Sequence, residues 1–188
     1  MKVVRGSIRT RMPEPVPYSP DKILEVLERH GVHYIVIGGL AAELRGSPYA
    51  TRDVYVTPSR ERANLGRLAD ALRELKATLR IPNVDGPVEF PLDQHSFDWG
   101  TTWTFVTEHG YLDIALLPDG TRGYDDLRKG ASRERITDSL EVNVASLADV
   151  IRSKEAAGRE KDRAVLPVLR QVLERSREIE RDGPDMDF

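Results

Sequence analysis

Two adjacent glycines stand between a strand-like and a helix-like stretch, an arrangement that can bind phosphate. Residues 34–37 are aliphatic or aromatic and indicate a short buried strand. Gly38 and Gly39 follow, and residues 40–45 favour a helix that Gly46 would end. Such a turn exposes backbone N–H groups at the positive end of the helix dipole, where a phosphate is stabilised. Gly-Gly is also an ordinary turn, so the pair alone is weak support.

Acidic residues occur in two further strand-like stretches. Residues 52–57 alternate, which places Asp53 and Tyr55 on one face of a strand. Asp113 is the single charged residue of the stretch 110–117. It could be a buried ion-pair partner, but a lone buried carboxylate is unfavourable without a cation. Acids at positions i and i+2 would present two carboxylates to a divalent metal, and here the second position holds Tyr55.

The ordered combination of these motifs resembles a known superfamily. Gly38-Gly39, then residues 51–55 (Thr-Arg-Asp-Val-Tyr), then Leu112-Asp113 resemble the DNA polymerase β-like nucleotidyltransferases. Within them the chain is most similar to the AbiEii/MenT-type toxins of bacterial toxin–antitoxin systems. The family pattern is Gly-Gly or Gly-Ser, a helix, Asp-x-Asp on a strand, and a third Asp on a neighbouring strand. Tyr55 departs from this pattern at the second metal-binding Asp.

The resemblance implies both a fold and a function. The expected fold is α/β (α+β), with a small mixed, twisted sheet flanked by helices and a C-terminal helical portion. The expected substrates are ATP or another nucleoside triphosphate (NTP) and the 3′ end of tRNA, whose extension would block aminoacylation. Mg²⁺ or Mn²⁺ is the expected cofactor, a cognate antitoxin the expected partner, and the cytoplasm the expected location.

Tyr55 affects the expected metal chemistry. Nucleotidyl transfer attacks an α-phosphate with a hydroxyl, and two metal ions about 3.5–4 Å apart stabilise the attacking and leaving oxygens. Asp53 and Asp113 supply two of the three acids that would hold them. Tyr55 cannot replace the third, because its phenol is neutral near pH 7 and its ring is bulky. We therefore expect weakened magnesium binding and a chain that Tyr55 inactivates.

Further site residues follow from the same resemblance. The charged run 154–162 resembles a set that the family carries on the helix after the sheet. By that resemblance Lys154 and Arg159 neutralise the triphosphate, and Asp162 orients one of them. Lys154 and Asp162 would share one helix face if the helix is continuous. Without the resemblance this run would be a solvated helix surface.

Two residues beside the expected metal site complete the set. Thr51 and Arg52 are expected nucleotide contacts. In the family a hydroxyl near the site can be phosphorylated, which silences the enzyme, and Thr51 holds that position here.

Two other functions remain open on the sequence. The first is nucleotidyl transfer to a small molecule, such as an aminoglycoside, or to a protein. The second is a catalytically degenerate fold that binds a nucleotide or a partner without turnover, and Tyr55 supports this interpretation.

Composition limits the function classes. The chain has 188 residues, which suits one domain, and its net charge of −3 provides no overall basic field for RNA. RNA binding would therefore need a local basic patch. With no cysteine, disulfides, a thiol nucleophile and a cysteine-based zinc site are excluded. No apolar stretch is long enough to span a bilayer.

The expected organisation divides the chain into four parts. They are a basic, proline-rich arm (1–19), a nucleotidyltransferase core (20–145), a C-terminal helical portion (146–182) and a loose tail (183–188). Serine caps predict helix starts at Ser19, Ser59 and Ser146. Residues 101–107 and 111–117 predict a hairpin that would place Asp113 beside the Asp53 strand.

Overall fold

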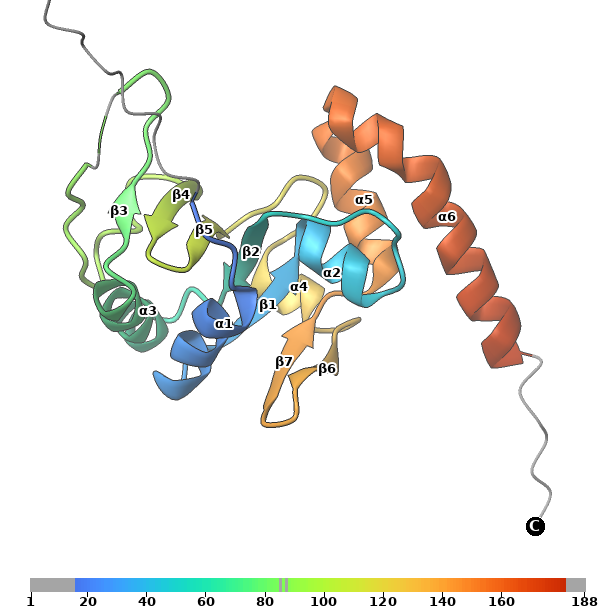
Figure 1. Ribbon diagram of the computed structural model, residues 1–188, viewed down its shortest axis with the longest axis horizontal. Coiled ribbons are helices and arrows are strands. Elements are labelled where there is room, and N and C mark those ends of the chain that lie inside the picture. Colours follow the sequence, from blue (N-terminus) through green and yellow to red (C-terminus); the bar gives the residue numbers. More distant parts are fainter. Residues whose placement is uncertain (1–15, 85, 87, 182–188) are drawn as a thin grey trace, which may run out of the picture.

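A mixed sheet forms the centre of the computed structural model, which describes residues 16–84, 86 and 88–181 (Figure 1). The strand order is β3-β4-β5-β2-β1-β7-β6. The strands are β1 (Tyr34–Ile37), β2 (Asp53–Pro58), β3 (Thr78–Leu79), β4 (Thr102–Thr107), β5 (Gly110–Ala115), β6 (Ser132–Thr137) and β7 (Leu140–Val144). The helices are α1 (Pro20–Arg29), α2 (Gly38–Leu44), α3 (Arg62–Glu74), α4 (Tyr124–Leu127), α5 (Leu147–Ala157) and α6 (Glu160–Arg181).

The central strands carry the acidic positions. All four residues of β1 are buried, as expected for an apolar strand in the middle of a sheet. β2 runs antiparallel to β1 and parallel to β5, and Tyr55 lies directly opposite Asp113. β4 and β5 form the predicted hairpin. The prediction that this hairpin sets Asp113 beside the Asp53 strand is confirmed.

Helices flank the sheet in two groups. α1 contacts α3 as well as β2, β5 and β7, whereas α5 contacts α2 and α6. Figure 1 shows α1 and α3 together at one end of the view and α5 and α6 together at the other. The apolar residues of α1 and α3 join the strands in one continuous core. The expected fold, a mixed sheet flanked by helices with a C-terminal helical portion, is confirmed.

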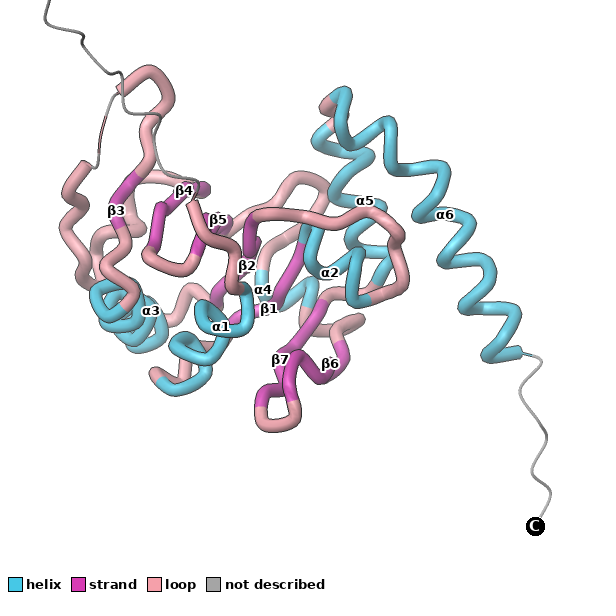
Figure 2. Tube along the Cα trace, viewed as in Figure 1, coloured by secondary structure: helices cyan, strands magenta, loops and turns pink. Residues whose placement is uncertain are grey.

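Several local predictions differ from the structure. Ser59 does not cap a helix, because α3 begins at Arg62 with Glu61 in the N-cap position. Ser19 and Ser146 are N-cap residues, but only the Ser146 side chain accepts a hydrogen bond, from the N–H of Asp149. The short edge strand β3 carried no recognisable pattern. The connection from β3 to β4 is long and irregular (Figure 2). Most of the predicted arm and the whole tail lie outside the described residues.

Candidate functional site

A cavity of about 240 Å³ lies where α2, β2 and β5 meet α5 and α6. It brings together nearly all the residues that the sequence singled out, namely Gly38, Gly39, Thr51, Asp53, Tyr55, Asp113, Lys154, Arg159 and Asp162. Arg52 is the exception, since it is exposed and does not line the cavity. Arg52 lies at a bend just before β2, so the strand alternation that places Asp53 and Tyr55 on one face does not extend to it.

The two glycines allow α2 to begin against β2. The helix starts at Gly38 itself, so the pair forms its first two residues and is not a turn before it. Gly38 has φ +75°, and a Cβ there would lie 2.8 Å from Cδ1 of Tyr55. A Cβ on Gly39 would lie 2.6 Å from Oγ1 of Thr51. Close packing against β2 therefore requires glycine here, in addition to any contact with phosphate.

The two carboxylates occupy different environments. The hydroxyl of Thr51 donates a hydrogen bond to Oδ1 of Asp53. Oδ1 of Asp113 is buried and has no hydrogen-bond partner among the described residues. Burial raises the pKa of Asp113, a hydrogen bond from Thr104 opposes that shift, and the charge of Asp53 adds to it. Asp113 therefore carries an unsatisfied acceptor at the cavity, a position that favours a cation or a proton donor.

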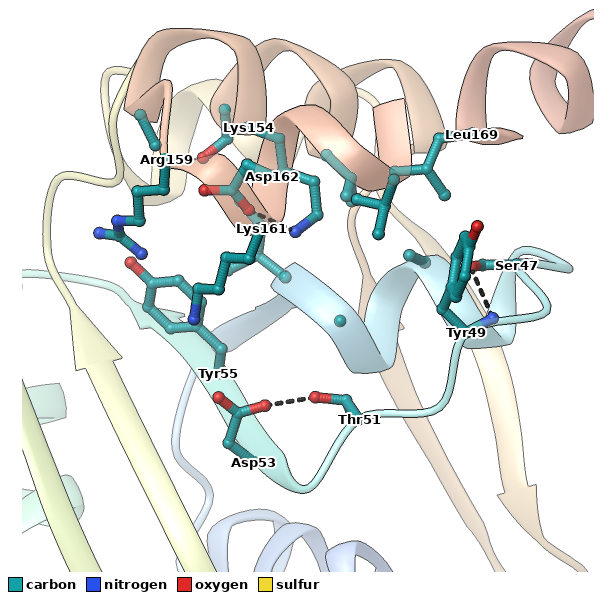
Figure 3. A pocket seen from close by; sticks show the side chains of 18 of the residues that line it. Ser47, Tyr49, Thr51, Asp53, Tyr55, Lys154, Arg159, Lys161, Asp162 and Leu169 are labelled. Atoms are coloured by element: carbon teal, nitrogen blue, oxygen red, sulfur yellow. Dashed lines mark hydrogen bonds and ion pairs between the residues drawn. The ribbon is translucent and has the colours of Figure 1, made fainter. Parts of the chain in front are cut away.

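Tyr55 is a neutral phenol beside these acids. Burial and the charge of Asp113 raise the pKa of Tyr55 to about 12. Figure 3 shows its hydroxyl pointing toward Arg159, and Lys161 lines the same cavity. At neutral pH it remains protonated, so it can donate a hydrogen bond but cannot act as an anionic metal ligand.

The acidic residues fit one divalent cation better than two. Among the described residues no group of three or more His, Cys, Asp or Glu side chains could hold a metal ion. Mg²⁺ is commonly bound by one or two carboxylates together with substrate phosphates and water. Asp53 and the unsatisfied oxygen of Asp113 would supply these carboxylates, and the neutral phenol of Tyr55 would add no further one.

The basic side chains come from a corner between α5 and α6. The condition of one continuous helix is not met, because α5 ends at Ala157, Gly158 follows with φ +61°, and α6 begins at Glu160. A glycine in this left-handed conformation is a common helix end. Lys154 and Asp162 nevertheless meet across the corner, where Nζ of Lys154 donates to Oδ1 of Asp162 at 2.8 Å.

Burial makes this ion pair part of the cavity wall. The side chain of Asp162 is 5% exposed and that of Lys154 is 19% exposed. Arg159 and Lys161 are exposed at the corner and project toward Tyr55 and Asp53 (Figure 3). The corner therefore presents several positive charges to the two carboxylates, which suits a polyphosphate between them.

The cavity wall also contains residues that received no role from the sequence, among them Lys161, Asp119 and Tyr49. Lys161 belongs to the charged run, but its direction depends on the corner at Gly158, which the sequence did not reveal. Asp119 lies in the loop after β5, and its Oδ2 is 4.0 Å from Nη2 of Arg159. Tyr49 stands in the loop between α2 and β2, and nothing in the residues around it indicated that its ring would reach the cavity.

Comparison with known proteins adds a structural relationship. No protein-family model and no curated protein matches the sequence. Among solved structures, the lincosamide antibiotic adenylyltransferase LnuA with bound lincomycin superimposes with a TM-score of 0.54 at 13% identity, covering 81% of this chain and 94% of that one. Weaker likeness is found to a candidate nucleotidyltransferase from Thermotoga maritima (TM-score 0.49, 18% identity, 82% and 90% covered). The antibiotic-resistance factor ANT(2″)-Ia is also similar (TM-score 0.45, 14% identity, 86% and 94% covered).

The likeness to LnuA establishes the fold. The match extends over most of both chains, so the sheet and the C-terminal helices are arranged as in a nucleotidyltransferase. At 13% identity it shows the fold alone, and the chemistry must be argued from the cavity.

Proposed function

We propose that the cavity binds a nucleoside triphosphate and that the chain is a nucleotidyltransferase. One observation carries the proposal. Asp53 and Asp113, from the paired strands β2 and β5, share a cavity with the basic residues of the α5–α6 corner. Carboxylates and cations in one place suit a magnesium-bound polyphosphate, which needs both. The nucleotidyltransferase fold, shared with LnuA, supports the same assignment.

The chain's own residues would assist the transfer in two ways. Lys154, held by Asp162, would neutralise the triphosphate together with Arg159 and Lys161 as pyrophosphate leaves. Asp113, on the wall of the cavity, would take the proton of the attacking hydroxyl. A bound Mg²⁺, held by Asp53 and Asp113, would supply positive charge to the phosphates.

Tyr55 would keep turnover low. Its ring stands beside Asp113, at the position where the family pattern has a carboxylate, and it carries no charge at neutral pH. The chain would bind nucleotide with its basic corner but stabilise the transition state poorly. With Tyr55 the chain would therefore correspond to the second alternative from the sequence, a catalytically degenerate fold that binds a nucleotide without turnover.

The acceptor belongs to one of two classes. The resemblance to toxins of the AbiEii/MenT type favours the 3′ hydroxyl of tRNA, with a cognate antitoxin to restrain the activity. A small-molecule hydroxyl is the second candidate. It is favoured by the fold that the chain shares with LnuA, an adenylyltransferase that acts on a lincosamide.

The test restores the missing carboxylate. Tyr55→Asp, incubated with Mg²⁺, each labelled triphosphate and an acceptor, should transfer label roughly a hundredfold faster than the unaltered chain, because metal-borne charge stabilisation contributes several kcal/mol. Tyr55→Asn is the matched control, because asparagine has nearly the volume of aspartate but carries no charge. Total tRNA, a lincosamide and an aminoglycoside, supplied separately, would identify the acceptor class.

The outcomes separate the alternatives. Label on tRNA supports the toxin assignment, and label on a drug supports the small-molecule assignment. If Tyr55→Asp binds ATP but labels none of these acceptors, the transferase proposal is wrong and the chain is a nucleotide-binding protein. If neither form binds a triphosphate, the assignment of the cavity itself fails.

A further inference from the structure

The cavity has two chemically different ends. Figure 3 shows Tyr55, Arg159 and Lys161 at one end and Tyr49 and Leu169 at the other. All five side chains line the same cavity. One end is therefore charged and the other carries an aromatic ring and an aliphatic side chain. A nucleoside triphosphate has the same division, since its phosphates are anionic and its base is a flat aromatic ring.

Tyr49 is held at the apolar end by its loop. Its N–H donates to the hydroxyl of Ser47 at 3.2 Å, and the N–H of Ser47 donates at 2.9 Å to the carbonyl of Ala42, two residues before the end of helix α2. Ser47 is buried, with 8% of its surface exposed. The backbone at Tyr49 is thus fixed to a buried anchor, so little conformational entropy would be lost when a ligand binds there.

The ring of Tyr49 is itself available for stacking. Tyr49 is 46% exposed, so its side chain is open to solvent at the cavity wall. In the described part of the chain no aromatic ring or cation stacks on it. Leu169, at the same end, is 1% exposed, so it is held in place by packing and lines the cavity with very little accessible surface. An open ring beside a rigid aliphatic wall is a site that a planar aromatic group can occupy.

We propose that Tyr49 is the stacking platform for the nucleobase of the bound triphosphate. The inference rests on the proposed function and adds the base-binding part of the site. With the base on Tyr49, the phosphates extend along the cavity past Gly38 and Gly39 toward Arg159 and Lys161. Base–aromatic stacking tolerates every base, because each has a π-face. We therefore infer that purine triphosphates bind more tightly than pyrimidine triphosphates through larger stacking area, with little preference between adenine and guanine.

The experiment separates the base from the phosphates. Affinities of ATP and of inorganic tripolyphosphate, both with Mg²⁺, are measured by calorimetry for the unaltered chain, Tyr49→Ala and Tyr49→Phe. Tyr49→Ala should weaken ATP binding roughly tenfold, the size of one base–aromatic contact, and leave tripolyphosphate unchanged. Tyr49→Phe keeps the ring and should bind ATP as the unaltered chain does. Trp99→Ala removes an aromatic residue that is 91% exposed and does not line the cavity, so it should change neither affinity.

Each other outcome contradicts a specific step. Equal loss of ATP and tripolyphosphate affinity in Tyr49→Ala would mean that the residue only shapes the loop, which overturns the platform. If the unaltered chain binds ATP and tripolyphosphate equally tightly, the base contributes nothing to the affinity. That result would also contradict stacking on Tyr49, but it would be compatible with a triphosphate site in the cavity. If neither ligand binds the unaltered chain, the proposed function fails together with this inference.

Discussion

Asp113 and Tyr55 determine the electrostatics at the reacting end of the cavity. They are register neighbours across the β2–β5 ladder, so an acid at position 55 would lie beside Asp113. A phenol leaves Asp113 with a buried, unsatisfied oxygen. The sequence showed which residue types stand at these positions and on which strands. It could not show that Oδ1 of Asp113 has no partner among the described residues, because that depends on the side chains that pack around it in three dimensions.

The first prediction concerns the unsatisfied charge of Asp113. Burial raises the folded-state pKa of this carboxyl above the value of roughly 3.9 that it has in an unfolded chain. The folded state therefore binds the proton more tightly, and the stability from this group is present at low pH and lost as pH rises through the folded pKa. Asp113→Asn should thus unfold at a higher temperature than the unaltered chain at pH 7. This increase in unfolding temperature should become smaller as the pH approaches 4.

Thermal unfolding followed by circular dichroism between pH 4 and 7 measures this difference. Asp125→Asn is the control, because the side chain of Asp125 is 89% exposed and its removal should leave the midpoint nearly unchanged at every pH. A lower midpoint for Asp113→Asn at pH 7, or a gain that does not vary with pH, would show that Asp113 is already compensated in the folded protein.

At the scale of elements, the α5–α6 corner shows where sequence reasoning succeeds and where it stops. The sequence indicated that Lys154 and Asp162 act together, and they do form an ion pair. They do not share one helix face, because the helix is not continuous: Gly158 follows α5 in a left-handed conformation. A glycine inside a charged, helix-forming run is compatible with both a weakened helix and a helix end. Only packing against the rest of the chain decides between them, and that choice also aims Lys161 into the cavity.

The second prediction measures what this ion pair contributes. In a double-mutant cycle with Lys154→Met and Asp162→Asn, each single change leaves a largely buried polar group without its partner. The double variant should regain part of the loss, with a coupling free energy of about 1–2 kcal/mol. Unfolding in urea supplies the four free energies.

A neighbouring pair between the same two helices is the control. Arg170 and Glu155 also connect α6 to α5, but their side chains are 56% and 44% exposed. Solvent screens such a pair, so its coupling should be close to zero. Equal coupling in both cycles would mean that burial of Asp162 adds nothing to the strength of the contact across the corner.

For the whole molecule, the cavity is the place where the sheet and the C-terminal helices meet. β2 and β5 supply the carboxylates, whereas α5 and α6 supply the cations. The sequence predicted both sets, and it could predict the carboxylates in more detail because a strand ladder fixes neighbours by register. The approach of α5 and α6 depends on a corner and on packing against α2, which no local pattern encodes. No helix in the described part of the chain is long and apolar enough to cross a membrane.

Because both parts of the molecule line the cavity, a ligand that fills it should stabilise them together. At a hundred times its Kd, ATP with Mg²⁺ would add about 2.7 kcal/mol to the free energy of unfolding, which corresponds to a midpoint roughly 5–10 °C higher for a chain of this size. Hydrogen exchange should slow in β2 and β5 and also in α5 and α6. Adenosine, which lacks the phosphates that the basic corner would bind, should raise the midpoint far less. Protection confined to the strands or to the helices would mean that ATP binds one side of the cavity only, and the two-sided site argued from Asp53, Asp113 and the corner would be wrong.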